Sequence, residues 1–229
     1  MAEYVFAPPT PPSVAVAGGK TRFPVRRIFC VGRNYAAHAR EMGKDPDQEP
    51  PFFFTKPADA VVDSGATLPY PPETEDLHYE VELVVAIGVG GSNIAEARAA
   101  QHIWGYGVGV DLTRRDLQNA AKALGRPWDW AKAFDRSAPC GPIARARDIG
   151  HPTQGRIWLA VNGVLKQDGA LQDMIWTPPA IIAVLSRSMD VRPGDLIFTG
   201  TPAGVGALQP GDQVDAGVED IGDVRFSLI

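Results

Sequence analysis

Hydrophobic positions in this chain fall in short runs that proline and glycine separate. Runs of this length that alternate with polar residues, or stop at turn residues, predict β-strands. Strands are expected in RRIFCVG (26–32), FFFTKP (52–57), ATLPYPP (66–72) and LHYEVELVVAIG (77–88). The segment RIWLAVNGVLKQDG (156–169) predicts a hairpin that turns at Asn162 and Gly163, and more short strands follow after residue 192.

A few segments instead show helical spacing or helix boundary residues. Helices are expected in RNYAAHAREMG (33–43), NIAEARAAQHIWG (93–105) and TPPAIIAVLSRSM (177–189). Another helix follows the strand GYGVGVD, with Thr113 as its N-cap and Gly125 at its end. Many short strands with few helices favour an α+β fold with a rolled or sandwiched mixed sheet over a doubly wound one.

The chain reads as an arm followed by one domain. Pro8, Pro9, Pro11 and Pro12 cannot continue a helix or donate to a sheet, so residues 1–22 are expected to form an extended arm. Residues 23–229 are expected to form a single catalytic domain, because 229 residues with 45% hydrophobic composition can bury one sizeable core.

Charge and composition narrow the functional classes. A net charge of −5 argues against a nucleic-acid partner, which needs clustered Lys and Arg. The chain has neither a signal-like start nor a long apolar run. We therefore expect a cytoplasmic protein that does not associate with a membrane. Cys30 and Cys140 are too far apart for a zinc motif and fit no disulfide framework, which predicts buried thiols.

Several common motifs fail on inspection. GGKT (18–21) resembles the end of a phosphate-binding loop, but the required glycine is replaced by Val14. GYGVGV lacks the spacing of a dinucleotide fingerprint. The sequence contains neither G-x-S-x-G nor H-E-x-x-H, so serine-type acyl transfer and zincin chemistry have no support.

Two acids stand in an otherwise apolar strand. Glu80 and Glu82 are two positions apart, so their side chains share one face of the strand. Asp111, at the end of another apolar strand, is a natural third partner. Three oxygen ligands suit Mg²⁺ or Mn²⁺, and a bound ion would also relieve the repulsion between the neighbouring carboxylates. The alternatives are solubilising acids on an exposed edge strand and, for Asp111, an ordinary strand-end acid.

Other candidates for chemistry are a histidine pair and two lysines. His38 and Glu41 have helical i, i+3 spacing, so Glu41 could orient His38 as a general base; a surface pair is the alternative. Lys56 and Lys132 lie in the apolar contexts FFFTKP and WAKAF. Either could stabilise an oxyanion, and the alternative is that each extends its ammonium to the surface.

Taken together, these segments resemble a known family. VGRNYAAHAREMG, PPFFFTKPADAVV, HYEVELVVAIG, GVDLTRRDLQ, GRPWDWAKAFD, VNGVLKQDG and RPGDLIFTGTPAGVG occur here in the order and spacing of the fumarylacetoacetate hydrolase superfamily. The similarity runs from about Phe23 to the C-terminus. It is strongest to members that hydrolyse fumarylpyruvate in the gentisate pathway of aromatic catabolism.

The resemblance implies a mixed β-roll, a homodimer and one Mg²⁺ or Mn²⁺ per subunit held by acids that match Glu80, Glu82 and Asp111. It implies that His38 and Glu41 lie on a lid. Lys132, Arg115, Gln118 and Thr201 match positions that line the family's pocket, and Arg33, Tyr35 and Lys56 are further candidates for substrate binding. Tyr79 replaces a second histidine of many relatives, and only a packing effect is expected from this.

The implied reaction is hydrolysis of the carbon–carbon bond of a 3-acylpyruvate, with fumarate and pyruvate as the products from fumarylpyruvate. His38 would activate water and Lys132 would stabilise the oxyanion, while the pyruvoyl end binds the metal. Arg33, Arg114, Arg115 and Lys56 are candidates for the distal carboxylate. Other acylpyruvates, oxaloacetate decarboxylation, keto–enol isomerisation and a non-catalytic structural Ca²⁺ site remain as alternatives.

Overall fold

The structure is a computed structural model that describes residues 3–36 and 50–229. Its largest sheet is mixed and has the order β4-β3-β15-β8-β9-β11-β5, with β12 paired to β9. Its strands are β4 (Phe52–Lys56), β3 (Arg27–Gly32), β15 (Asp195–Phe198), β8 (Val81–Ile87), β9 (Ile103–Val110), β11 (Ala138–Cys140), β5 (Val61–Asp63) and β12 (Ala144–Arg145).

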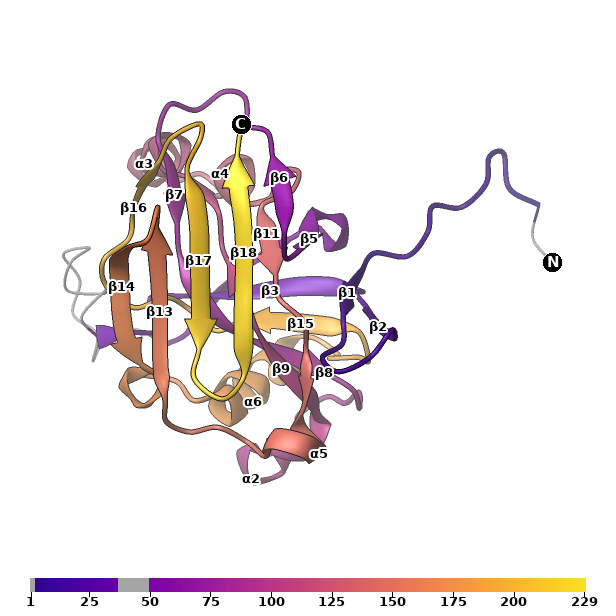
Figure 1. Cartoon of the computed structure of the whole chain (residues 1–229). Coiled ribbons are helices and arrows are strands. Elements are labelled where there is room, and N and C mark those ends of the chain that lie inside the picture. The colour runs from indigo at the N-terminus through magenta and orange to yellow at the C-terminus, as the bar shows by residue number, and fades with distance from the viewer. Residues whose placement is uncertain (1–2, 37–49) are drawn as a thin grey trace.

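A five-stranded sheet packs across this one, and Figure 1 shows its long strands in front of β8 and β9. Its order is β14 (Val164–Ala170), β13 (Arg156–Val161), β17 (Gln213–Val218), β18 (Gly222–Leu228) and β6 (Ala66–Leu68). Two small sheets complete the set: β10 (Thr113–Arg114), β7 (Leu77–Tyr79) and β16 (Gly206–Leu208) form one, and β1 (Ser13–Ala15) and β2 (Arg22–Pro24) form the other.

The helices are short and lie around the sheets (Figure 1). They are α2 (Glu96–Ala99), α3 (Arg115–Ala123), α4 (Asp129–Lys132), α5 (Ala146–Ile149) and α6 (Pro178–Ser188), with 3₁₀ turns η1 (Ala58–Ala60), η2 (Ala100–His102) and η3 (Leu171–Asp173). None of the helices in the described part of the chain has both the length and the apolar character needed to cross a bilayer. The mixed, curled sheet with peripheral helices confirms the expected fold class.

Strand β8 is buried on both faces because it lies at the centre of the large sheet, between β15 and β9. Leu83 and Val85 pack into the core shared with the five-stranded sheet, whereas Val84 belongs to a second core on the other face. Alternation along the strand places Glu82 on the same face as Val84. The acids therefore enter the protein interior from a central strand.

Local sequence patterns predicted three features correctly: one hairpin turn and two helix boundaries. The hairpin of β13 and β14 turns at Asn162 and Gly163, both of which have positive φ, as this turn type requires. Helix α6 begins with proline after Thr177, whose hydroxyl accepts a hydrogen bond from the Ala180 amide at 3.4 Å. The end of α3 also follows prediction, since Gly125 has a φ of +62° beyond the last helical turn.

Two expectations were wrong in part. Thr113 does not cap α3, because it pairs with His78 in the β10–β7 ladder, and the helix starts two residues later without a side-chain cap. The helix predicted over residues 93–105 is shorter, since Ile103 joins β9 and pairs with β8. The expected arm contains β1, which pairs with β2 and buries Val14 in the second core.

Candidate active site

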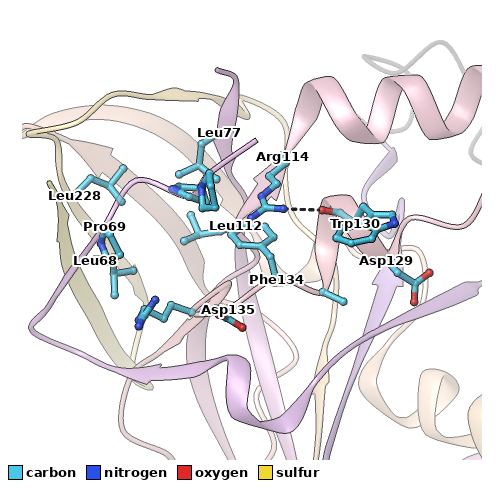
Figure 2. Close-up of a pocket in the computed structure, with 14 residues that line it drawn as sticks. Leu68, Pro69, Leu77, Leu112, Arg114, Asp129, Trp130, Phe134, Asp135 and Leu228 are labelled. Atoms are coloured by element: carbon cyan, nitrogen blue, oxygen red, sulfur yellow. Dashed lines mark hydrogen bonds between the residues drawn. The ribbon is translucent and has the colours of Figure 1, made fainter. Parts of the chain in front are cut away.

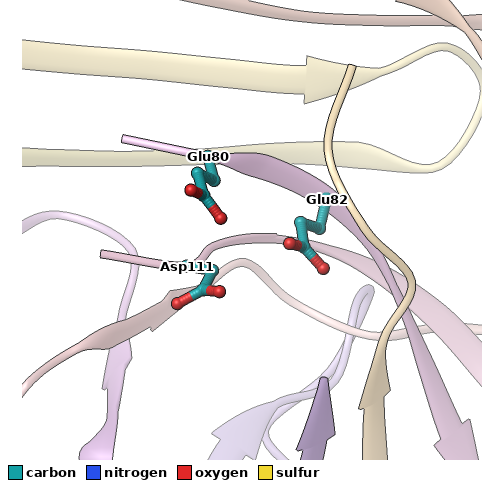
Figure 3. Close-up of side chains that lie close together, drawn as sticks. All are labelled: Glu80, Glu82 and Asp111. Carbon is teal, nitrogen blue, oxygen red and sulfur yellow. The ribbon is translucent and has the colours of Figure 1, made fainter. Parts of the chain in front are cut away.

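Three acids meet at the ends of β8 and β9, and Figure 3 shows their carboxylates pointing toward one another. Glu80 and Glu82 flank the first residue of β8, and Asp111 follows the last residue of β9. The antiparallel pairing of β8 with β9 sets this arrangement, and the Asp111 amide donates to the Glu80 carbonyl at 2.8 Å. One ligand atom from each acid lies within 4.8 Å of the others.

These acids are not solubilising residues on an edge strand. The exposed fractions of Glu80, Glu82 and Asp111 are 6%, 2% and 0%. Burial raises the pKa of Glu82 well above its usual range, and the neighbouring Asp111 and Glu80 raise it further. Buried carboxylates at this spacing repel one another, so the site requires positive charge.

Lys132 supplies part of that charge from helix α4. Its ammonium lies 2.8 Å from a Glu80 oxygen, 2.6 Å from an Asp111 oxygen and 2.6 Å from the Thr113 hydroxyl. Burial alone would lower the pKa of Lys132, but Asp111 and Glu80 raise it above its ordinary value. Lys132 is only 2% exposed, which excludes the interpretation that it reaches the surface.

Lys56, at the end of β4, serves the same cluster. Its ammonium lies 2.8 Å from the other Asp111 oxygen and donates to the backbone carbonyls of Leu112 and Lys132. It is also 2% exposed. Two of its donors are therefore bonded to backbone carbonyls, and its charge pairs with Asp111, so it links Asp111 to helix α4 inside the protein.

Helix α3 places a third cationic side chain, Arg115, beside the acids. The Arg115 guanidinium forms an ion pair with Glu80 and donates to the Gln118 side-chain oxygen at 2.6 Å. A further contact of 3.3 Å joins it to His78 on β7. Both Arg115 and Gln118 are buried. The first turn of α3 therefore forms one wall of the site.

The loop after β15 fixes the remaining acid. The Gly200 amide donates to a Glu82 oxygen at 2.7 Å. Gly200 has a φ of +94°, and a Cβ there would lie 2.7 Å from the Cβ of Asn34, so this position requires glycine. The adjacent Thr201 is buried and accepts a hydrogen bond from Gln167 at 2.8 Å.

The donor set fits a hard divalent ion. Three carboxylates without a sulfur ligand are the donors that Mg²⁺ and Mn²⁺ prefer. Glu80 and Glu82 line a pocket with Val31, Gly32, Arg33, Phe52, Phe54, Arg115, Gln118, Lys122, Trp128, Lys132 and Thr201. Its open volume is about 30 Å³, room for roughly one water molecule, so a substrate requires side-chain movement.

A larger cavity of about 460 Å³ is lined by other residues and does not contain Glu80, Glu82 or Asp111 (Figure 2). Arg114 lines this second cavity, stacks 4.4 Å from the Phe134 ring centre and donates to the Trp130 carbonyl. Arg114 and Arg115 are neighbours in sequence but serve different cavities. Chemistry rather than size identifies the active site, because the buried acids lie in the smaller pocket.

The structure brings most of the predicted residues together. One pocket is lined by seven of them: Glu80, Glu82, Arg33, Arg115, Gln118, Lys132 and Thr201. Asp111 lies behind this lining, where it pairs with Lys132 and Lys56. Tyr35 is buried nearby, and its hydroxyl has no partner among residues 3–36 and 50–229. Burial, followed by the charge of Glu82, raises the pKa of Tyr35. Tyr79 packs into the core. His38 and Glu41 lie outside the described residues.

Sequence reasoning missed an aromatic and cationic side of the pocket. The edge of Phe52 meets the Trp128 ring at 5.4 Å between centres, and Phe54 lies 5.8 Å from the same ring. The Lys122 ammonium sits 5.2 Å over Trp128. Lys122 follows Arg115 and Gln118 at i+7 and i+4 on α3, a spacing that could have identified it.

A buried oxygen-ligand metal site on a curled mixed sheet, with lysine and arginine against the acids, defines the class of protein. The comparisons agree: the family described as fumarylacetoacetate (FAA) hydrolase C-terminal matches residues 27–229. The chain belongs to this family.

Its relatives carry two activities in their names. A fumarylpyruvate hydrolase of Ralstonia sp is 44% identical over 82% of this chain and 98% of its own. A mitochondrial oxaloacetate tautomerase of Rattus norvegicus is 40% identical over 89% of this chain and 91% of its own. The crystal structure of fumarylpyruvate hydrolase from Pseudomonas aeruginosa with Mn²⁺ and pyruvate has a TM-score of 0.96 and 50% identity, and each chain is covered to 99%.

Proposed function

We propose that this protein is a metal-dependent hydrolase that cleaves the carbon–carbon bond of a 3-acylpyruvate, with fumarylpyruvate as the substrate. The observation that carries the proposal is the buried triad of Glu80, Glu82 and Asp111, in a chain that matches the Mn²⁺- and pyruvate-bound hydrolase over 99% of its length. A Mg²⁺ or Mn²⁺ ion held by these acids would supply Lewis-acid stabilisation of enolate charge.

The residues around the acids have separate tasks in this proposal. Lys132 and Arg115 keep Glu80 oriented through direct ion pairs, and Gly200 does the same for Glu82 through its amide. The oxygens of the substrate's pyruvoyl group would face Arg115, Gln118 and Thr201, which line the same pocket. A buried, preorganised polar wall of this kind stabilises developing charge better than water does.

The reaction would proceed by attack of water on the carbonyl carbon remote from the pyruvate carboxylate. His38, oriented by Glu41, would take the proton from water, and Lys132 would stabilise the resulting oxyanion. The bond between that carbon and the pyruvate methylene then breaks. Its electron pair forms the enolate of pyruvate, which a proton converts to pyruvate, while the acyl part leaves as fumarate.

The direct test follows the absorbance of fumarylpyruvate with purified protein, in EDTA and after addition of Mg²⁺ or Mn²⁺. Equal amounts of pyruvate and fumarate, released only with metal, are expected. Glu82→Gln should abolish the metal-dependent rate, and the exposed Lys166→Ala should not change it. Normal turnover by His38→Ala at unchanged metal content would refute the role of the histidine.

Oxaloacetate tautomerisation is the second candidate, and the identity of 40% to the rat tautomerase favours it. Both reactions stabilise an enolate, but only hydrolysis requires an activated water molecule. Enol-to-keto conversion of oxaloacetate can be followed by the loss of enol absorbance in the same metal series. Tautomerisation without cleavage of fumarylpyruvate would replace the hydrolase assignment and leave the metal site intact.

The same proposal includes the setting of the enzyme. We infer a homodimer in the cytoplasm that acts in aromatic catabolism through gentisate. Light scattering coupled to gel filtration would measure the mass, for which twice the value of the 24.5 kDa chain is expected. A monomeric mass for the active enzyme would refute the dimer.

A further inference from the structure

A linear dicarboxylic acylpyruvate brings a second carboxylate that needs its own cation. Most cations near the acids are already engaged: Lys56 with Asp111, Arg115 with Glu80, and Lys132 with both acids. Arg114 lines the other cavity. Among the basic residues that line the active-site pocket, Lys122 is the candidate that remains to be considered.

Lys122 is placed at the right end of the pocket. It lies seven residues after Arg115 on α3, which corresponds to about 10 Å along the helix axis. Six carbon–carbon bonds of about 1.5 Å each, in an extended zigzag, span roughly 8 Å between the two carboxyl carbons of fumarylpyruvate. A substrate whose pyruvoyl end lies beside Arg115 would therefore bring its distal carboxylate within reach of Lys122.

Lys122 has no ion-pair partner in the described part of the chain, although Glu80 lies in the same pocket and raises its pKa. It is half-buried. Its contact in this part of the chain is the face of Trp128, 5.2 Å away. Burial lowers the pKa of Lys122 to about 8, and the positive charge of Arg115 adds to this effect. A bound carboxylate would offset both.

The neighbouring wall suits the rest of such a substrate. Phe52, Phe54 and Trp128 form a contiguous aromatic surface between the acids and Lys122. A conjugated, planar fumaroyl chain can lie flat against rings of this kind. Arg33, whose guanidinium lies 5.3 Å from the Phe52 ring centre, adds positive charge to the same end of the pocket.

We propose that Lys122 binds the distal carboxylate of the substrate and makes the enzyme select dicarboxylic over monocarboxylic acylpyruvates. This rests on the proposed hydrolase function and adds a specificity residue to it. The alternative is that Lys122 only packs its stem against Trp128.

The test compares fumarylpyruvate with acetylpyruvate, which ends in a methyl group, in wild type and in Lys122→Met, which keeps the stem. The kcat/KM for fumarylpyruvate should fall by about 10- to 100-fold, as expected for a lost hydrogen bond to a charged group, mainly through KM. The value for acetylpyruvate should fall by less than threefold. Lys122→Arg should recover part of the loss, and Lys166→Met is the matched exposed control.

Product inhibition by added fumarate gives a second measurement. Its inhibition constant should rise about tenfold or more in Lys122→Met, while that of pyruvate stays near the wild-type value. Equal losses for both substrates, or no loss for either, in an otherwise active enzyme would overturn the role of Lys122 alone. A wild-type protein that cleaves neither acylpyruvate would overturn the proposed function and this inference together.

Discussion

Lys132 offers the sharpest test of the charge network, through the variant Lys132→Met. The substitution keeps most of the stem but removes contacts of 2.6 to 2.8 Å to Glu80, Asp111 and Thr113. Each hydrogen bond to a charged group contributes about 1.5–3 kcal/mol, and a simple sum overstates a shared network. Removing one partner of a buried ion pair costs about 3–5 kcal/mol, which we take as the expected loss in EDTA.

The assay is urea unfolding followed by fluorescence of the five tryptophans, in EDTA and again with Mn²⁺. In a separate thermal scan in EDTA, the midpoint of unfolding should fall by about 6–20 °C for a domain of this size. The loss should be smaller with Mn²⁺, because the ion supplies positive charge to the same acids and binding stabilises the folded state. Lys166→Met, at an exposed position, should stay within about 0.5 kcal/mol of wild type.

The charge network would be refuted if Lys132→Met lost less than about 1 kcal/mol in EDTA. That result would mean that the acids are protonated or that the ammonium contributes little to their stability. An equal loss with and without Mn²⁺ would instead separate the network from the metal site.

Three further predictions concern neighbouring groups. The raised pKa of Glu82 means that the folded protein binds more protons than the unfolded chain above the ordinary carboxyl value of 4.5. Stability in EDTA should therefore fall as pH rises above that value, and Glu82→Gln should flatten the urea-midpoint profile; an unchanged profile would contradict the assignment. Gly200→Ala should lose at least about 1–3 kcal/mol and more than Gly211→Ala, which has a φ of +93° but no atom within 4 Å; equal losses would rule out the clash with Asn34. Because free Lys122 has a pKa of about 8, kcat/KM for fumarylpyruvate should drop as pH rises through that value. The ratio of kcat/KM for fumarylpyruvate to kcat/KM for acetylpyruvate should drop with it. A ratio that does not change with pH would contradict binding of the distal carboxylate by Lys122.

The sequence predicted the acid cluster from two local features, the spacing of two acids along one strand and the position of the third at a strand end. The i, i+2 spacing of Glu80 and Glu82 fixes a shared face in any strand, and Asp111 ends the strand that pairs with β8. The same reasoning could not decide between Arg114 and Arg115. Their separation into two cavities depends on β10 pairing with β7 before the helix begins, and this is a tertiary contact.

The remaining errors also come from long-range pairing. Thr113 has the residue type of an N-cap, but its ladder contact with His78 and its hydroxyl contact with Lys132 determine its conformation. Lys122 was overlooked because an amphipathic helix gives every basic residue a plausible place on its exposed face. Its spacing from Arg115 and Gln118 was a usable signal, and the fold shows that it lies against Trp128 in the same pocket.

The position of β15 has a consequence for how the chain is made. This strand lies between β3 and β8 in the sheet, yet residues 195–198 are synthesised long after both of them. At about 5–20 residues per second, β8 waits roughly 5–22 s and β3 roughly 8–33 s for the strand that joins them. The loop that holds Glu82 follows β15, so the catalytic pocket cannot close on a nascent chain. Such long-range pairing predicts slow folding, exposed sheet edges on the ribosome, and loss of the whole site on truncation before residue 200.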